Sequence, residues 1–219
     1  MKSTFSRTAL AALTLCTCSI ASADFGVGLK AGTLGVGVEG RWSFLPWLDV
    51  RVGANRYDYD DDGSQAGINY DATFALDTFY ATGNLRVPLS PFRLTAGAFD
   101  NRNEFLLGSR DTGGANFNIG GASFSPADVG TVNAVASFDD VSPYLGIGYD
   151  VEIFGKVGFN LDFGVLWQGA PTVSMQADGL AADQQVFLDA LELERLELED
   201  ELNDFKAWPV VSLGFVYNF

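Results

Sequence analysis

The chain has 219 residues with 13 basic and 28 acidic side chains, a formal net charge of −15, and no histidine. This negative charge excludes nucleic acid as a partner, because one polyanion repels another. Without histidine the chain lacks the commonest general base, the commonest zinc ligand and any Ser-His or Cys-His nucleophile pair.

The first 23 residues have the pattern of a secretory signal peptide. Lys2 and Arg7 precede the uncharged stretch 8–20, and the Ala-Ser-Ala sequence at 21–23 offers a small-x-small cleavage site. Both cysteines lie in this segment, so we expect a mature chain, 24–219, without thiols or disulfides. Cleavage removes two basic residues and leaves 11 basic against 28 acidic side chains, a charge of 11 − 28 = −17.

Apolar and polar residues alternate along most of the mature chain, which predicts β-strands with two different faces. We expect strands at 34–44, 47–59, 68–87, 92–106, 131–152, 156–178 and 207–219. An eighth strand is expected at 25–31, where the apolar parity is odd, whereas it is even after the Gly-Thr-Leu-Gly sequence at 32–35. A tight turn there makes 25–31 a separate strand, and a bulge would fuse it with the next one.

The lengths of the links distinguish a membrane barrel from a soluble β-sandwich, the default for an alternating chain. The links near Pro46, at 88–91 and at 153–156 are short, and the links at the other end are long and polar. Short periplasmic turns and long external loops are typical of transmembrane barrels. The run 157–167 also has about the length that a tilted strand needs to cross a bilayer.

Charged residues recur on the second face of these strands, which would line the lumen. An eight-stranded barrel is just wide enough for its own side chains or one small ligand. We favour ion pairs that fill the lumen, and a narrow polar path for small solutes is the alternative. The expected lumen charges are Glu39, Arg41, Asp49, Arg51, Asp77, Arg93 and Asp162.

The Asp-Tyr-Asp-Asp-Asp-Gly sequence at 58–63 repeats the first half of a calcium-binding loop. Asp58, Asp60 and Asp62 alternate before a glycine, but the twelfth position is Asn69 and not a glutamate. We therefore favour a solvated acidic loop over a calcium site. The glycine-rich segment at 107–130 predicts a flexible or hairpin-forming loop without a phosphate-binding pattern.

The segment 179–206 contains the one strong helical pattern, in a context rich in Asp and Glu. Strand parity places it in the last external loop. The favoured interpretation is a cap packed over the barrel rim, and a partner-binding helix is the alternative. Its apolar stripe follows helical spacing and consists of Phe187, Leu191, Leu198, Leu202 and Phe205.

The last strand ends on an aromatic residue, with Leu213, Phe215, Tyr217 and Phe219 on one face. This strand resembles the assembly signal of bacterial outer-membrane barrels, and the mature chain is similar to the small OmpA-type and OmpW-type eight-stranded barrels. The resemblance implies a location in the bacterial outer membrane. It also implies outer-membrane lipid, lipopolysaccharide and the barrel assembly machinery as partners.

The sequence therefore predicts an all-β, antiparallel, up-and-down transmembrane barrel of eight strands with one acidic helix in its last external loop. We expect a structural or surface-interaction protein with a side-chain-filled lumen and an external protein partner. A narrow channel or binding barrel for small solutes is the alternative. An outer-membrane enzyme is the weakest of the three, and we expect no catalytic residue, cofactor or metal.

Overall fold

The computed structural model describes residues 24–65, 68–109, 114, 116–153 and 156–219. The expected signal peptide, 1–23, lies outside the described residues and stays a prediction. No helix in the described ranges is both long and apolar enough to cross a membrane.

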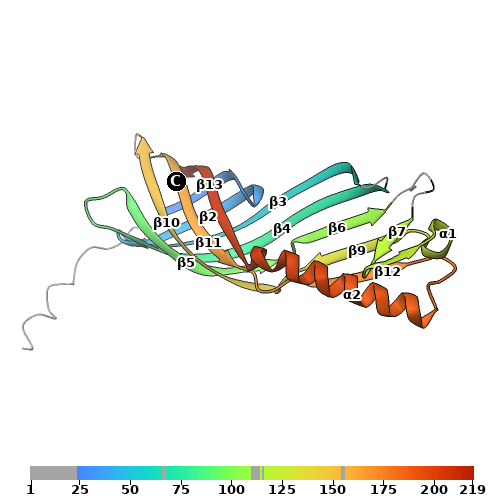
Figure 1. Ribbon diagram of the computed structural model, residues 1–219. Helices are drawn as coiled ribbons and strands as arrows, with labels where there is room; N and C mark the ends of the chain where they lie inside the picture. Colours follow the sequence, from blue (N-terminus) through green and yellow to red (C-terminus); the bar gives the residue numbers. More distant parts are fainter. Residues whose placement is uncertain (1–23, 66–67, 110–113, 115, 154–155) are drawn as a thin grey trace, which may run out of the picture.

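Eight antiparallel strands close into a barrel, in which β1 pairs with both β2 and β13 and β5 pairs with both β4 and β10 (Figure 1). This confirms the predicted fold class. The barrel strands are β1 (Asp24–Gly32), β2 (Gly35–Leu45), β3 (Leu48–Gln65), β4 (Ile68–Arg86), β5 (Phe92–Asn101), β10 (Val141–Ile153), β11 (Val157–Trp167) and β13 (Ala207–Asn218).

The link between β1 and β2 is a tight turn and not a bulge. Gly32 pairs with Gly35, which leaves Thr33 and Leu34 as the two turn residues. Gly35 has a φ of +95°, a conformation that glycine adopts without strain. The turn makes β1 a separate strand, which brings the barrel to the even number expected of a single-chain bacterial barrel.

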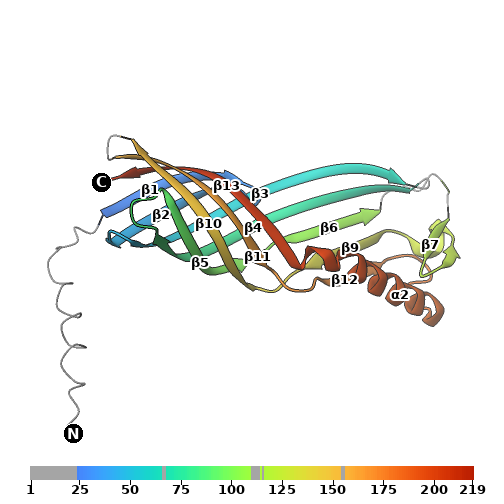
Figure 2. The ribbon, with the colours of Figure 1, turned by 60° about the vertical axis from the view of Figure 1, so that its left-hand side comes forward.

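Strands β3 and β4 are much longer than their neighbours and continue past the barrel at the end opposite the two termini (Figure 2). There β4 pairs with β6 (Glu104–Ser109), β6 with β9 (Val132–Ser137), and β9 with β12 (Thr172–Ala177). We call this open sheet, with the hairpin and helices attached to it, the extension.

Three of the predicted strands are each split in two where the barrel passes into the extension. The predicted strand 92–106 becomes β5 and β6, 131–152 becomes β9 and β10, and 156–178 becomes β11 and β12. Between β5 and β6 the side chain of Asn103 replaces a backbone acceptor, because its Oδ1 accepts a 3.1 Å hydrogen bond from the Asp77 N–H. Between β11 and β12 the chain bends at Gly169, which has a φ of +75°.

The glycine-rich loop forms the predicted hairpin. Strands β7 (Phe117–Ile119) and β8 (Ala122–Phe124) are joined by Gly120 and Gly121, both with positive φ. Such a two-residue turn matches the twist of the strands it connects. A short helix, α1 (Pro126–Val129), follows, and the Ser125 hydroxyl caps its N-terminus by accepting from the Asp128 N–H.

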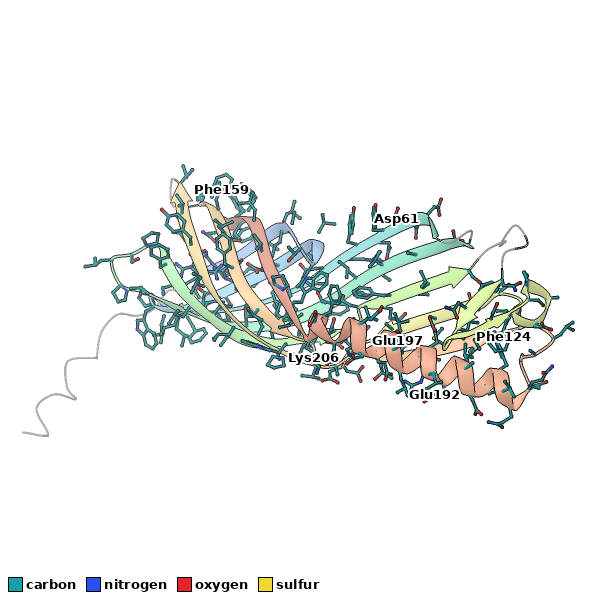
Figure 3. All side chains as sticks on the ribbon, in the orientation of Figure 1. Asp61, Phe124, Phe159, Glu192, Glu197 and Lys206 are labelled. Atoms are coloured by element: carbon teal, nitrogen blue, oxygen red, sulfur yellow. The ribbon has the colours of Figure 1, made fainter. Side chains whose placement is uncertain are left out.

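The acidic helix α2 (Gln185–Glu201) continues as the 3₁₀ helix η1 (Leu202–Lys206) and lies along the extension, not over the barrel rim. Its side chains Phe187 and Leu191 are buried in a core with β7 and β8, and Phe187 packs edge-on against Phe124. Phe124 is labelled in Figure 3. The prediction of a cap over the rim was therefore wrong. The extension has its own hydrophobic core, and α2 closes it.

The edge strand of the extension, β12, is protected by α2. The backbone N–H of Val173 donates a 2.9 Å hydrogen bond to Oε1 of Glu199, so a helix carboxylate replaces a neighbouring strand. Glu194 likewise accepts from the backbone N–H of Gly120 at the hairpin. Covering an edge with a helix hinders pairing with another chain, so α2 disfavours strand addition on this side of the sheet.

The outer surface of the barrel is an apolar band. Most outward side chains of the barrel strands are aliphatic or aromatic, and many of them are exposed in the isolated chain, as for Phe159 in Figure 3. Backbone polar groups are satisfied by the closed sheet, which is the condition for a strand protein to span a bilayer. The band includes Phe25, Val27, Leu29, Val38, Trp42, Val52, Leu94, Leu145, Ile147, Phe159, Phe163, Leu213, Phe215 and Tyr217.

Candidate functional site: the lumen and the extension

Arg51 of β3 lies at the centre of the barrel lumen and joins three strands. Its guanidinium donates to Asp49 Oδ1 at 3.1 Å, to Glu39 Oε1 at 3.2 Å and to Asp150 Oδ2 at 3.0 Å. These partners come from β3, β2 and β10, so one side chain crosses the whole interior. The planar fork of arginine suits several carboxylates at once, which a lysine would not satisfy in the same way.

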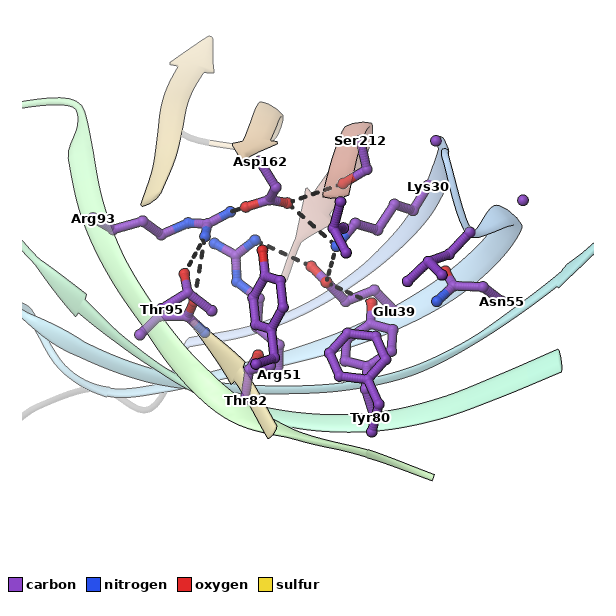
Figure 4. A pocket seen from close by; sticks show the side chains of 17 residues that line it. Lys30, Glu39, Arg51, Asn55, Tyr80, Thr82, Arg93, Thr95, Asp162 and Ser212 are labelled. Atoms are coloured by element: carbon purple, nitrogen blue, oxygen red, sulfur yellow. Dashed lines mark hydrogen bonds and ion pairs between the residues drawn. The ribbon is translucent and has the colours of Figure 1, made fainter. Parts of the chain in front are cut away.

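Arg93 of β5 forms the second centre (Figure 4). It donates to Asp162 Oδ1 through Nη2 and to Thr95 Oγ1 at 2.8 Å, as drawn in Figure 4. It also donates to both oxygens of Asp150. Lys30 Nζ lies 3.2 Å from Asp162 Oδ2 and 3.8 Å from Glu39 Oε2. Together these contacts link β1, β2, β5, β10 and β11 through charged side chains.

Two more arginines form ion pairs in the lumen, nearer the end of the barrel where β1 begins and β13 ends. Arg86 Nε lies 2.9 Å from Asp49 Oδ2, and Arg41 Nη2 lies 3.2 Å from Glu152 Oε1. We call the ten side chains the lumen network. Its charges balance, with five basic residues (Lys30, Arg41, Arg51, Arg86, Arg93) and five acidic ones (Glu39, Asp49, Asp150, Glu152, Asp162).

An apolar cluster closes the other end of the lumen, next to the extension. The rings of Tyr80 and Phe99 are stacked with centroids 4.9 Å apart, and Phe99 lies 5.2 Å from Tyr144. Leu34, in the turn between β1 and β2, is buried among them. We call this cluster the aromatic plug, and it consists of Leu34, Tyr80, Phe99, Tyr144, Leu166 and Val210.

The space left between the lumen network and the aromatic plug is about 20 Å³. A cavity needs roughly 10–15 Å³ by the same measure to hold one water molecule. This space therefore has room for about one water and none for a sugar or an amino acid. In this conformation the barrel is filled by its own side chains.

Six of the seven predicted lumen charges are buried in the lumen network, and Asp77 is not. Asp77 lies half-buried on the outer face of β4, the face of the exposed Phe79, whereas Thr78 and Tyr80 point inward. Its backbone N–H and carbonyl bind the segment between β5 and β6. The assignment of Asp77 to the lumen was wrong.

The sequence interpretation missed four members of the lumen network: Lys30, Arg86, Asp150 and Glu152. All four lie on the inward parity of their strands, beside outward apolar residues such as Leu29 and Val151. Applying the alternation rule to β1, to the end of β4 and to β10 would have found them. The side-chain partners could not have been found this way, because they depend on the stagger of strands far apart in the sequence.

The acidic stretch 58–62 is a strand and not a loop. Asp58, Asp60 and Asp62 lie on one face of β3, and Asp61 lies on the other. Asp58 pairs with Arg56, and Asp60 accepts a 2.8 Å hydrogen bond from Thr73 Oγ1. Within the described ranges, no group of three side chains is arranged to hold a metal ion.

The inner face of the extension carries an aromatic surface above the plug. Phe105 of β6 is its centre, with ring centroids 5.1 Å from Phe74, 5.4 Å from Phe138 and 6.4 Å from Trp208. Tyr59 of β3 continues this surface, 6.3 Å from Phe74. A cavity of about 340 Å³ opens here.

The apolar stripe of the predicted helix packs against other parts of the same chain. Phe187 and Leu191 are buried, Leu198 and Leu202 are half-buried, and Phe205 contacts Phe105 and Trp208 while it stays partly exposed. The proposal that these residues face a partner was therefore wrong for the buried members of the stripe. On the polar side of α2, hydrogen bonds from Arg195 hold the pKa of the exposed Glu192 below its usual value.

The C-terminal strand places its predicted signal residues as expected, on the outer face. Leu213, Phe215, Tyr217 and Phe219 are all exposed. The terminal residue is anchored, because the backbone N–H of Phe219 donates to the Phe25 carbonyl at 2.9 Å and its ring lies 6.4 Å from that of Phe25. Whether assembly factors read this strand stays a prediction.

Comparison with solved structures finds the same fold. The chain is similar to CarO2 of Acinetobacter baumannii, with 21% identity, a TM-score of 0.61, and coverage of 90% of this chain and 99% of that one. CarO of the same organism has 23% identity, a TM-score of 0.58, and coverage of 89% and 97%. A major outer membrane protein of Thermus thermophilus is more distant, with 16% identity, coverage of 90% and 100%, and a TM-score of 0.41.

No protein-family model and no curated protein matches the sequence. The closed sheet, the apolar outer band and the structural matches agree on the class of protein. The chain has the fold of the small eight-stranded β-barrels of the bacterial outer membrane.

Proposed function

We propose that this protein is a non-conducting outer-membrane barrel that presents the extension as a surface for interaction outside the cell. The observation that carries the proposal is the filled lumen, in which the lumen network and the aromatic plug leave only about 20 Å³. The ten charged side chains of the lumen network are all in ion pairs, so they hold one another across the interior of the barrel. We propose no catalytic role for any residue.

The topology supports the external position of the extension. The short links between β2 and β3, β4 and β5, and β10 and β11 lie at the end of the barrel where β1 begins and β13 ends (Figure 2). The extension lies at the other end, together with the two-residue turn between β1 and β2. In bacterial barrels the short turns face the periplasm and the long loops face outward. Outer-membrane lipid, lipopolysaccharide and the assembly machinery are therefore the proposed partners of the barrel, and an external macromolecule is the proposed partner of the extension.

A liposome-swelling assay tests the closed lumen. The purified protein, folded into phosphatidylcholine liposomes, is diluted into isotonic arabinose, and a general diffusion porin at equal protein content is the positive control. We expect no swelling above protein-free liposomes. Swelling at a substantial fraction of the porin rate, by protein whose folding is shown by heat-modifiable gel mobility, would establish the alternative of a solute channel.

A further inference from the structure

We propose that residues 57–62 of β3 form a docking edge for an extended cationic segment of a partner protein, which adds to the sheet as a further strand. Strand β2 pairs with β3 only as far as Arg56, opposite Val36, whereas β4 continues to pair with β3 beyond that point. In the part of the chain that the structure describes, 57–62 therefore has a strand neighbour on one side only. This inference rests on the proposed role of the extension as an external interaction surface.

The open edge is long enough for specific pairing. Six residues of a strand extend over about 20 Å, and alternate residues direct their backbone N–H and C=O groups to the free side. The opposite edge of the same sheet, at β12, is covered by α2 through the bond between Val173 and Glu199. The two edges of the sheet therefore differ. Helix α2 contacts the β12 edge, whereas no described strand pairs with 57–62 on the side away from β4.

The 340 Å³ cavity on the inner face lies directly beside this edge. Its lining includes Thr33 and Gly35 at the turn between β1 and β2, and also Tyr57, Tyr59 and Phe74. A strand added to β3 would continue the line of β2 beyond that turn. Its inward side chains would therefore enter the cavity and contact the two tyrosine rings, both nearly half exposed.

The negative charge of the edge favours a positively charged partner segment. Four carboxylates, Asp58, Asp60, Asp61 and Asp62, lie within five residues, and the nearby basic group is Arg56, which pairs with Asp58. Three of them face the outer side of the sheet, where the alternate side chains of an added strand would lie. A second copy of this edge would place like charges opposite one another, which is unfavourable. A segment that alternates basic and apolar residues fits both faces.

A binding titration with a synthetic peptide tests the proposal. The probe is the capped heptapeptide Lys-Val-Lys-Phe-Lys-Val-Lys with a fluorescent label, titrated by anisotropy against the full mature chain in uncharged phosphatidylcholine nanodiscs. The control peptide has the same sequence with N-methyl groups on two consecutive central residues, which blocks backbone pairing on both of its edges. We expect saturable binding of the first peptide and at least about tenfold weaker binding of the second, because strand addition depends on main-chain hydrogen bonds.

Matched variants locate the site. The double substitution Asp60→Asn with Asp62→Asn should weaken binding of the peptide by about three- to tenfold, as expected for two exposed charge pairs. The control is Asp183→Asn with Asp204→Asn, which removes the same charge from exposed positions on the other side of the extension. Binding by this control should equal that of the native chain.

Four results would overturn the proposal: no saturable binding, equal affinity for the N-methylated peptide, equal weakening by both pairs of substitutions, or dimerisation of the chain through 57–62. The second and third would indicate adsorption to the acidic surface as a whole. A barrel that conducts arabinose yet binds the peptide as expected would overturn the closed-lumen function and leave the docking edge intact. The two failures are therefore distinguishable.

Discussion

The hydroxyl of Tyr80 donates a 2.8 Å hydrogen bond to Oε2 of Glu39, and this bond joins the aromatic plug to the lumen network. The other oxygen of Glu39 accepts from Arg51. One carboxylate thus connects the aromatic plug with the lumen network. We therefore expect the contacts of Glu39 with Tyr80 and Arg51 both to block the lumen and to stabilise the folded barrel.

Replacement of Glu39 tests this connection. The substitution Glu39→Ala leaves Arg51 short of a partner in the lumen and should lower the free energy of unfolding by about 3–5 kcal/mol. The substitution Tyr80→Phe removes only the hydroxyl and should cost about 1 kcal/mol. Urea titrations of protein folded in lipid vesicles measure both values. An equal or smaller loss for Glu39→Ala would show that the network does not stabilise the barrel.

The orientation of the outer band is tested at Phe163, which is 45% exposed on the lipid-facing side of β11. The substitution Phe163→Arg should cost about 2–4 kcal/mol if this residue lies near the middle of the bilayer. Ser174→Arg, on the exposed face of β12 in the extension, is the matched control and should change stability by less than about 0.5 kcal/mol. Similar values for the two variants in vesicle-folding titrations would contradict the assigned membrane position.

The separate core of the extension predicts local unfolding without loss of the barrel. Phe187 is 1% exposed, and Phe187→Ala should destabilise this core by about 3–5 kcal/mol. The neighbouring Val186 is 74% exposed, so Val186→Ala should have almost no effect. Protease added to intact cells should cleave the Phe187 variant within 179–206 and leave the barrel and the control uncut. Protection of both variants until the outer membrane is permeabilised would reverse the proposed topology.

The anchored C-terminus predicts an assembly defect. Removal of Phe219 deletes the hydrogen bond to the Phe25 carbonyl and the aromatic ring that follows β13. We expect a lower amount of the protein in the outer membrane and a smaller fraction in the heat-modifiable, folded form. The variant Phe219→Tyr keeps an aromatic terminus and should assemble normally. Equal abundance of the deletion and the native chain would show that assembly does not depend on this residue.

The sequence was sufficient for the barrel because membrane strands obey one simple rule. Alternation predicted the strands and most of the lumen charges, and the change of parity before Leu34 left a turn and a bulge as alternatives, which only the register of β1 with β2 decides. The rule fails at Asp77 for a physical reason. Residues 70–77 of β4 lie at the junction with the extension, where the outer face meets water and the apolar residues Phe74 and Leu76 turn inward.

The extension was harder to predict because its contacts are not periodic. Breaks such as that at Asn103 depend on a side chain that replaces a backbone acceptor from another strand. The partner of α2 is a core built from β7, β8, β9 and β12, which are distant in the sequence. The apolar stripe through Phe187 and Leu191 could be found from helical spacing, but not the surface that covers it. The free edge of β3 is likewise a property of the register with β2.

Single-channel recording in planar bilayers tests the closed lumen most directly, because it detects a path even for ions. The native chain, reconstituted in phosphatidylcholine at 1 M KCl, is compared with a quadruple variant that removes charge and bulk together, Glu39→Ala, Arg51→Ala, Arg93→Ala and Tyr80→Ala. The account predicts no stepwise current for the native chain and discrete steps for any folded fraction of the variant. Uniform, reproducible steps from the native chain would contradict the filled lumen and the proposed function with it.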